Sequence, residues 1–175
     1  MARGLTAIVL GIDAVSSLDD EAQLRFLEEA IDLFFQEPRD PKELAVWFRL
    51  FERFPEDDGY EMFWAVLHGI EALPGIEPLV VESVRRRPSR FPVQMLNRML
   101  NAGTTHVEGA SVLELLESVA SNPISPQSVR EDAQEFIAYQ RGRTQGRRLV
   151  TDENRHLPWN DKLDQKPGPR EEPPC

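Results

Sequence analysis

The sequence has few of the residues that build metal sites, disulfides and nucleophilic active sites. Its 175 residues include one cysteine, Cys175, and three histidines, His68, His106 and His156. A single cysteine excludes a disulfide within the chain and a thiolate metal cluster. The histidines are too far apart in the sequence to pair as zinc ligands. We therefore expect no metal and no cofactor.

Catalytic motifs and long apolar runs are also missing. The sequence contains no glycine-rich phosphate loop, no GxSxG elbow and no Cys/His pair, which predicts a protein that is not an enzyme. No run approaches 18 apolar residues, so we expect no membrane-spanning helix. The stretch from Leu5 to Gly11 faintly resembles a signal peptide, but it is short and is followed by Asp13. These features indicate a cytoplasmic protein.

Acidic residues outnumber basic ones and are unevenly distributed. Thirty Asp and Glu against 20 Lys and Arg give a net charge of −10. The composition changes near Gln140, and residues 140–175, rich in Pro and Arg, predict a disordered tail. That tail carries eight basic and six acidic residues, which leaves residues 1–139 with 12 basic against 24 acidic, a balance of −12. Such a domain repels phosphate backbones, so we expect a basic protein partner and no nucleic acid.

Seven segments have the apolar spacing of amphipathic helices, with residues recurring at three- and four-residue steps. Proline or a polar capping residue stands at the start or end of nearly every one. The predicted helices cover Ser17 to Gln36, Asp40 to Phe54, Asp58 to Leu73, Pro78 to Arg87, Pro92 to Gly103, Val112 to Ala120, and Ser125 to Ile137. The best candidate strand, Thr6 to Val9, is too short to form a sheet without partners.

The predicted fold class is all-α. Two successive helices make a unit of about 35 residues, which is in the range of HEAT-type helical pairs. Two architectures remain open: a short HEAT-like α-solenoid, or an irregular bundle of about seven antiparallel helices. The segment from Asp58 to Leu73 is apolar on nearly its whole circumference, which predicts a central buried helix with His68 hydrogen-bonded in the core.

Two acidic clusters are the candidate sites. Carboxylates beside amphipathic aromatic residues are typical of a protein interface, because charge steers the encounter and a desolvated aromatic residue anchors it. Helix capping and solubility would explain the same carboxylates equally well. The candidate partner-binding residues are Glu56, Asp57, Asp58, Tyr60 and Glu61 in one cluster, and Asp19, Asp20, Glu28 and Asp32 in the other. The basic stretch from Arg85 to Arg90 closes a helix, and we interpret it as structural.

One part of the chain resembles a known family. The residues that carry the resemblance are Phe63 to Glu71, Pro74 to Pro78, Leu79 to Pro92, and Met95 to Gly103. They resemble the all-helical immunity proteins of bacterial polymorphic toxin systems, the small antidotes made beside contact-dependent or secretion-delivered toxins. The similarity spans roughly residues 40–138 and does not include the proline-rich tail. It implies binding to a cognate toxin domain and blocking of that domain, without chemistry of its own.

The predicted function is therefore that of an immunity protein. A basic nuclease-type toxin fits the charge, because a carboxylate array can occupy a groove built to hold phosphates. The alternative is a HEAT-like adaptor or scaffold that binds an endogenous protein or peptide along a concave face. The sequence does not indicate an oligomeric state.

Overall fold

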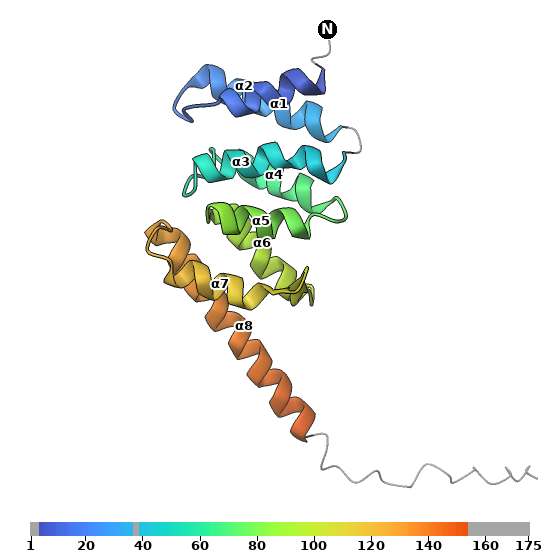
Figure 1. Cartoon of the computed structure of the whole chain (residues 1–175), viewed down its shortest axis with the longest axis vertical. Helices are drawn as coiled ribbons and strands as arrows, with labels where there is room; N and C mark the ends of the chain where they lie inside the picture. The colour runs from blue at the N-terminus through green and yellow to red at the C-terminus, as the bar shows by residue number, and fades with distance from the viewer. Residues whose placement is uncertain (1–3, 37–38, 154–175) are drawn as a thin grey trace, which may run out of the picture. The chain divides into compact units, whose positions relative to one another are not determined.

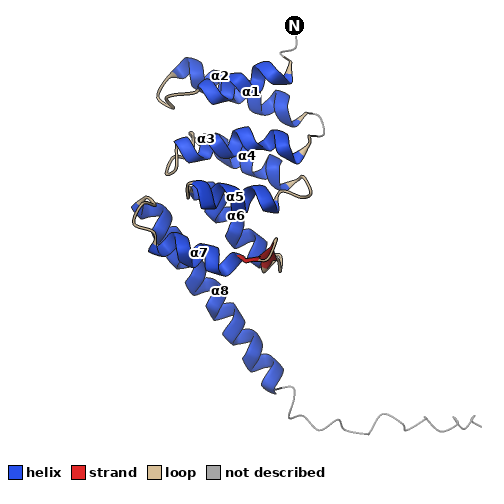
Figure 2. Cartoon of the chain, viewed as in Figure 1, coloured by secondary structure: helices blue, strands red, loops and turns tan. Residues whose placement is uncertain are grey.

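The computed structural model describes residues 4–36 and 39–153. Among these residues it contains eight α-helices, one 3-10 helix and a two-stranded hairpin, which confirms the all-α class (Figure 2). The elements are α1 (Leu5–Ala14), α2 (Glu21–Phe35), η1 (Pro41–Leu44), α3 (Ala45–Arg53), α4 (Met62–Glu71), α5 (Glu77–Arg86), α6 (Arg90–Asn101), β1 (His106–Val107), β2 (Ala110–Ser111), α7 (Val112–Ser121) and α8 (Gln127–Glu153).

The chain divides into two units, Met1–Gln140 and Arg141–Cys175. Helix α8 continues through this boundary to Glu153, so the first residues of the predicted tail are helical. The composition misled at this point because Gln140, Arg141 and Arg143 are polar but favour helix. The rest of the predicted tail, residues 154–175, lies outside the described residues.

The helices of the first unit form two layers (Figure 1). In one layer α1 packs on α3, α3 on α5, and α5 on α7; in the other, α2 packs on α4 and α4 on α6. Each hairpin therefore packs mainly on the hairpins before and after it, which is the arrangement of an α-solenoid. Of the two predicted architectures, the structure has the solenoid-like stack.

The centre of the core is α3 rather than the predicted 58–73 helix. Trp47, Phe48 and Phe51 of α3 are at most 1% exposed. Helix α4 buries Phe63 but leaves His68 exposed, so the prediction of a core histidine is wrong. Helix α3 contacts α1, α5 and α6, whereas α4 has one side open to solvent. The sequence predicted complete burial of α4 because apolar residues such as Met62 and Trp64, which are only half-buried, extend around the helix.

Helix α1 was not predicted. Its β-branched residues around Thr6 to Val9 suggested a short strand, but Ile8 and Ile12 lie one helical turn apart and are both buried. The β1–β2 hairpin was also missed. It is closed by Glu108 and Gly109, whose φ angles of 48° and 81° suit a two-residue hairpin turn.

Arginines of α3 join the first two hairpins. The Arg49 guanidinium donates to both carboxylate oxygens of Asp13 at 3.0 and 2.7 Å. The Arg53 guanidinium donates to the backbone carbonyls of Asp13 at 2.8 Å and Ile12 at 2.6 Å. These carbonyls lie in the last turn of α1, where a helix end leaves acceptors to be satisfied from outside. The Ile12 carbonyl also accepts from the Val15 amide at 3.2 Å, so Arg53 adds a second donor there. Helix α1 is thereby fixed to the core as well as packed on it.

Candidate functional site

One predicted acidic cluster and the first two residues of the other lie at the same edge of the stack, while Glu28 and Asp32 lie farther along α2. Asp19 and Asp20 precede α2, and residues 56–61 precede α4. Helices α2 and α4 pack in one layer and start from the same side of the stack. Helices α6 and α8 start from that side too (Figure 1). We call this side the turn edge; its loops are residues 15–20, 54–61, 87–89 and 122–126. The fold therefore places Asp19 and Asp20 at the same edge as residues 56–61, which are about 40 residues farther along the sequence.

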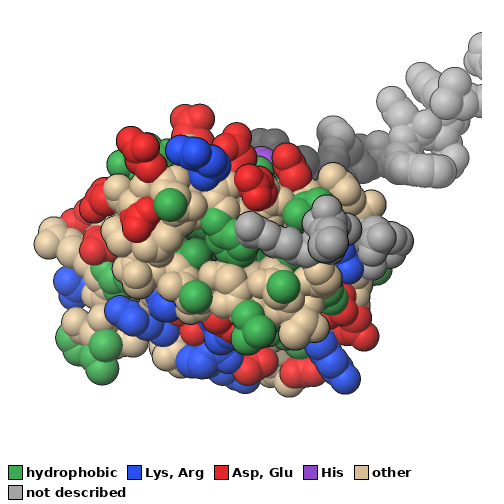
Figure 3. Space-filling model, turned by 90° about the horizontal axis from the view of Figure 1, so that it is seen from above, with side chains coloured by type: hydrophobic (Ala, Val, Ile, Leu, Met, Phe, Trp, Pro, Cys, Tyr) green, Lys and Arg blue, Asp and Glu red, His purple; other side chains and the backbone are tan. Residues whose placement is uncertain are grey.

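The acidic stripe is formed by Glu21, Glu28 and Asp32, which are exposed on one side of α2, while Leu27 and Phe34 are buried on the other. The spacings of seven and four residues place the three carboxylates in line. Among the described residues, no ion pair engages Glu28 or Asp32. Seen from the α1–α2 end, acidic side chains are the most frequent charged ones along one rim, and the opposite rim has Lys and Arg mixed with further acidic side chains (Figure 3).

Asp20 has a structural role. Its Oδ1 accepts hydrogen bonds from the backbone amides of Ala22 at 2.8 Å and Gln23 at 3.2 Å. Its Oδ2 accepts from the Gln23 side-chain amide at 3.0 Å, and this bond is the main cause of the lowered pKa of Asp20. Asp20 is thus the N-cap of α2, three residues after Ser17, where the sequence pattern predicted that the helix begins. Asp19 beside it is exposed.

The 54–61 loop contains four carboxylates and no cation, and two of the carboxylates hold its shape. Asp57 accepts from the backbone amide of Gly59 at 2.8 Å. Glu56 accepts from the Ser128 hydroxyl, in the first turn of α8, at 2.5 Å. Asp58 is half-buried, and Glu61 is exposed. Glu56 and Asp57 therefore shape the loop, while Asp58 and Glu61 have no such bond among the described residues.

Tyr60 sits in a run of left-handed backbone. Gly59, Tyr60 and Glu61 have φ angles of 57°, 53° and 70°. For a residue with a side chain, this region costs roughly 1–2 kcal/mol. Gly59 has no alternative, because a Cβ there would lie 2.8 Å from the ring of Phe63. Tyr60 is 67% exposed, so the loop presents an aromatic side chain among carboxylates instead of burying it.

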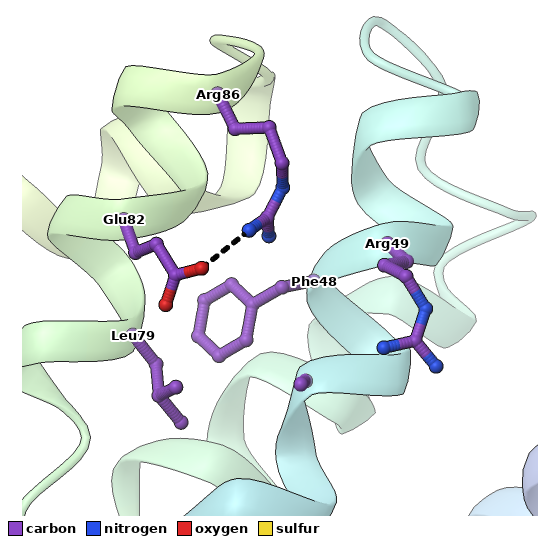
Figure 4. Close-up of a pocket in the computed structure, with 6 residues that line it drawn as sticks. Phe48, Arg49, Leu79, Glu82 and Arg86 are labelled. Atoms are coloured by element: carbon purple, nitrogen blue, oxygen red, sulfur yellow. Dashed lines mark hydrogen bonds and ion pairs between the residues drawn. The ribbon is translucent and has the colours of Figure 1, made fainter.

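A groove of about 240 Å³ lies elsewhere, between α3 and α5 (Figure 4). Phe48 and Leu79 give it apolar walls, and Arg49, Glu82 and Arg86 surround them. No predicted site residue lines this groove. The sequence could have indicated it only through pairing of α3 with α5, since Phe48 and Leu79 belong to different helical pairs. The arginines pair with Asp13, Glu52 and Glu82, so the groove offers apolar surface and balanced charge.

The described part of the chain has no candidate metal site and no helix that could span a membrane. Within residues 4–36 and 39–153, no three His, Cys, Asp or Glu side chains converge to hold a metal ion. The helices of the same residues include none with the length and apolarity needed to cross a bilayer. The chemistry available at the turn edge is hydrogen bonding and electrostatic attraction.

Comparisons with protein-family models, with curated proteins and with solved structures found no match to this chain.

Proposed function

We propose that this protein is an immunity protein that binds a cognate bacterial toxin domain and blocks it by contact. The observation that carries the proposal is the concentration of negative charge at the turn edge and along α2. Residues 19–32 hold six carboxylates and one arginine, and residues 54–61 hold four carboxylates with no cation. A rigid helical stack supports both segments, so little ordering entropy is lost when a partner binds.

A basic nuclease-type domain is the partner that this surface fits best. Nucleases need cationic grooves to hold phosphates, and a carboxylate array at helical spacing competes for the same cations. Long-range attraction speeds the encounter, and the exposed Tyr60 supplies the aromatic contact that typically dominates affinity at such interfaces. In this proposal the protein acts in the cytoplasm, performs no catalysis and needs no cofactor.

The first test is rescue of cells that express the toxin domain encoded beside this chain. Co-expression is expected to restore growth, and calorimetry of the purified pair is expected to show a nanomolar complex. Absence of rescue, or of a complex at nanomolar concentration, rejects the proposal. Binding should weaken steeply as salt is raised, because exposed charges are screened beyond a Debye length.

Charge variants then locate the interface. The test variant removes four negative charges that make no local bond among the described residues: Glu28→Gln, Asp32→Asn, Asp58→Asn and Glu61→Gln. The matched control removes four elsewhere: Glu77→Gln, Glu108→Gln, Glu114→Gln and Glu135→Gln. Both change net charge by +4, so non-specific effects of charge are equal. The test variant should lose at least tenfold in association rate, and an equal loss in the control would contradict the proposed surface.

The alternative function is a HEAT-like adaptor, and the α3–α5 groove is the observation that favours it. Phe48 and Leu79 offer an apolar seat for a peptide side chain, with arginines at its margin. Binding there depends on burial of apolar area and changes little with salt. Loss of binding on Leu79→Asp, combined with salt independence, would support the adaptor over the immunity protein.

A further inference from the structure

The turn edge exposes an aliphatic side chain as well as carboxylates and Tyr60. Among the described residues, the large hydrophobic side chains that are mostly exposed are Leu10, Tyr60, Ile124 and Tyr139. Two of these, Tyr60 at 67% and Ile124 at 89%, lie in turn-edge loops, 54–61 and 122–126. One exposed hydrophobic residue needs no explanation, but two on neighbouring loops of a candidate interface do.

Hydrogen bonds join these two loops. Glu56, four residues before Tyr60, accepts from the hydroxyl of Ser128, four residues after Ile124, at 2.5 Å. The 54–61 loop is also fixed to the start of α6, because the Arg90 amide donates to the Pro55 carbonyl at 2.9 Å. Both loops lie on the same side of the stack (Figure 1). Tyr60 and Ile124 are therefore held on one continuous part of the turn edge.

A tight turn holds Ile124 in its exposed position. The Asn122 side-chain oxygen accepts from the Ile124 amide at 2.9 Å, and the Asn122 carbonyl accepts from the Ser125 amide at 3.1 Å. Pro123 restricts the backbone between them, and Ser125 is buried beneath the turn at 4% exposure. Ile124 is thus presented to solvent by an ordered backbone. A partner that buries it pays little backbone entropy.

Charge around the two residues indicates what could bury them. The 54–61 loop has four carboxylates and no cation, whereas residues 122–126 have no charged side chain. A basic protein whose cationic surface borders an apolar recess complements both loops at once. A second copy of the chain would bring like charges together, and an anionic membrane surface would repel the carboxylates.

We propose that Ile124 is an apolar anchor of the partner contact, together with Tyr60, and that it enters an apolar recess beside the cationic groove of the toxin domain. This inference rests on the proposed function and adds a residue that the charge pattern does not single out. The two kinds of contact have separate kinetic roles. The carboxylates speed the encounter, and burial of the apolar pair slows dissociation.

Binding kinetics of the full chain with the toxin domain encoded beside it test the proposal. Ile124→Ser should raise the dissociation rate about tenfold and leave the association rate within about twofold of wild type. Leu10→Ser, at a residue that is 64% exposed on α1 and outside the turn-edge loops, should change neither rate. Circular dichroism melting shows that each variant is folded. The opposite pattern, a slower association, is expected of the variant with Glu28→Gln, Asp32→Asn, Asp58→Asn and Glu61→Gln.

The outcomes separate this inference from the proposed function. A wild-type chain that forms no complex with the toxin domain rejects both. A wild-type complex whose dissociation rate is unchanged by Ile124→Ser, or is changed equally by Leu10→Ser, overturns the anchor and leaves the immunity function standing. Self-association of the chain, or binding to anionic lipid vesicles, that Ile124→Ser abolishes would give Ile124 a different occupant and overturns the anchor as well.

Discussion

Glu52 of α3 and Arg86 of α5 form a two-point ion pair between successive hairpins. Arg86 Nε donates to Glu52 Oε2 at 2.9 Å, and Nη2 donates to Oε1 at 2.8 Å. Glu52 is only 7% exposed, and the hydroxyl of Ser83 also donates to it at 2.6 Å. A carboxylate this deep is tolerated because three donors satisfy it. One arginine of the basic stretch therefore holds the stack together.

Replacing Glu52 should be costly. Glu52→Ala leaves Arg86 and Ser83 without their acceptor, and we expect the free energy of unfolding to fall by about 2–3 kcal/mol, since the half-exposed arginine regains water. Glu82→Ala, which removes an exposed partner of the same arginine, should cost about 0.5 kcal/mol or less. Urea denaturation of both variants measures the difference. Equal losses in the free energy of unfolding would show that the buried Glu52–Arg86 pair stabilises the protein no more than the exposed Glu82–Arg86 pair.

Glycine at either left-handed position should stabilise the 54–61 loop. Tyr60→Gly and Glu61→Gly should each raise the free energy of unfolding by about 0.5–1 kcal/mol, because glycine adopts positive φ without strain. Glu28→Gly, in the middle of α2, should lower it by about 1 kcal/mol. If the proposed interface is correct, Tyr60→Gly and Glu61→Gly both combine higher stability with weaker partner binding, because the first removes the exposed aromatic contact and the second removes a carboxylate. Destabilisation by both loop variants would contradict the strain argument.

Ionisation of Asp132 on α8 should lower the stability of the protein at neutral pH but not in acid. Burial raises the pKa of Asp132, and Arg90 opposes part of that effect. The folded state therefore favours the protonated carboxyl, and the ionised form destabilises the protein above its folded pKa. Asp132→Asn should raise the melting temperature at pH 7, and the gain should vanish below the unfolded pKa. A gain that persists at pH 3 would rule out ionisation as its cause.

Asp20 should have the opposite dependence on pH. The side-chain hydrogen bond from Gln23 holds the pKa of Asp20 below the ordinary value of 3.8. Its stabilising effect is therefore complete above 3.8 and is lost as the pH falls through the lower folded value. Asp20→Ala should melt earlier than wild type at pH 7 and lose this difference in strong acid. Asp20→Asn keeps an acceptor and serves as the control.

Local signals predicted much of the helical framework. The helix predicted from Asp40 begins there, with the Asp40 carboxylate accepting from the Lys42 amide at 2.9 Å, although its first turn is 3-10. Signals that depend on neighbouring helices failed. The apolar pattern of α4 predicted a central helix, but α3 has that position because it packs against α1, α5 and α6. Helix α1 has no polar cap to mark its start, since Gly4 offers no side chain there.

The acidic residues themselves were visible in the sequence, but their gathering at one edge was not. It follows from the direction in which alternate helices run, and no local pattern encodes that direction. The bond between Glu56 and Ser128 joins residues 72 positions apart, and it converts one predicted interface residue into a structural one.

Because the fold is a stack of hairpins, the loops at the turn edge can change in sequence and length with little effect on the rest of the structure. Two of these loops, residues 15–20 and 54–61, carry six carboxylates, while the helices behind them supply most of the core. Because each hairpin packs mainly on its two neighbours, lengthening or recharging one loop disturbs only a local part of the stack. If the turn edge binds the proposed partner, its loops can change one at a time and alter partner specificity while the helical stack stays the same.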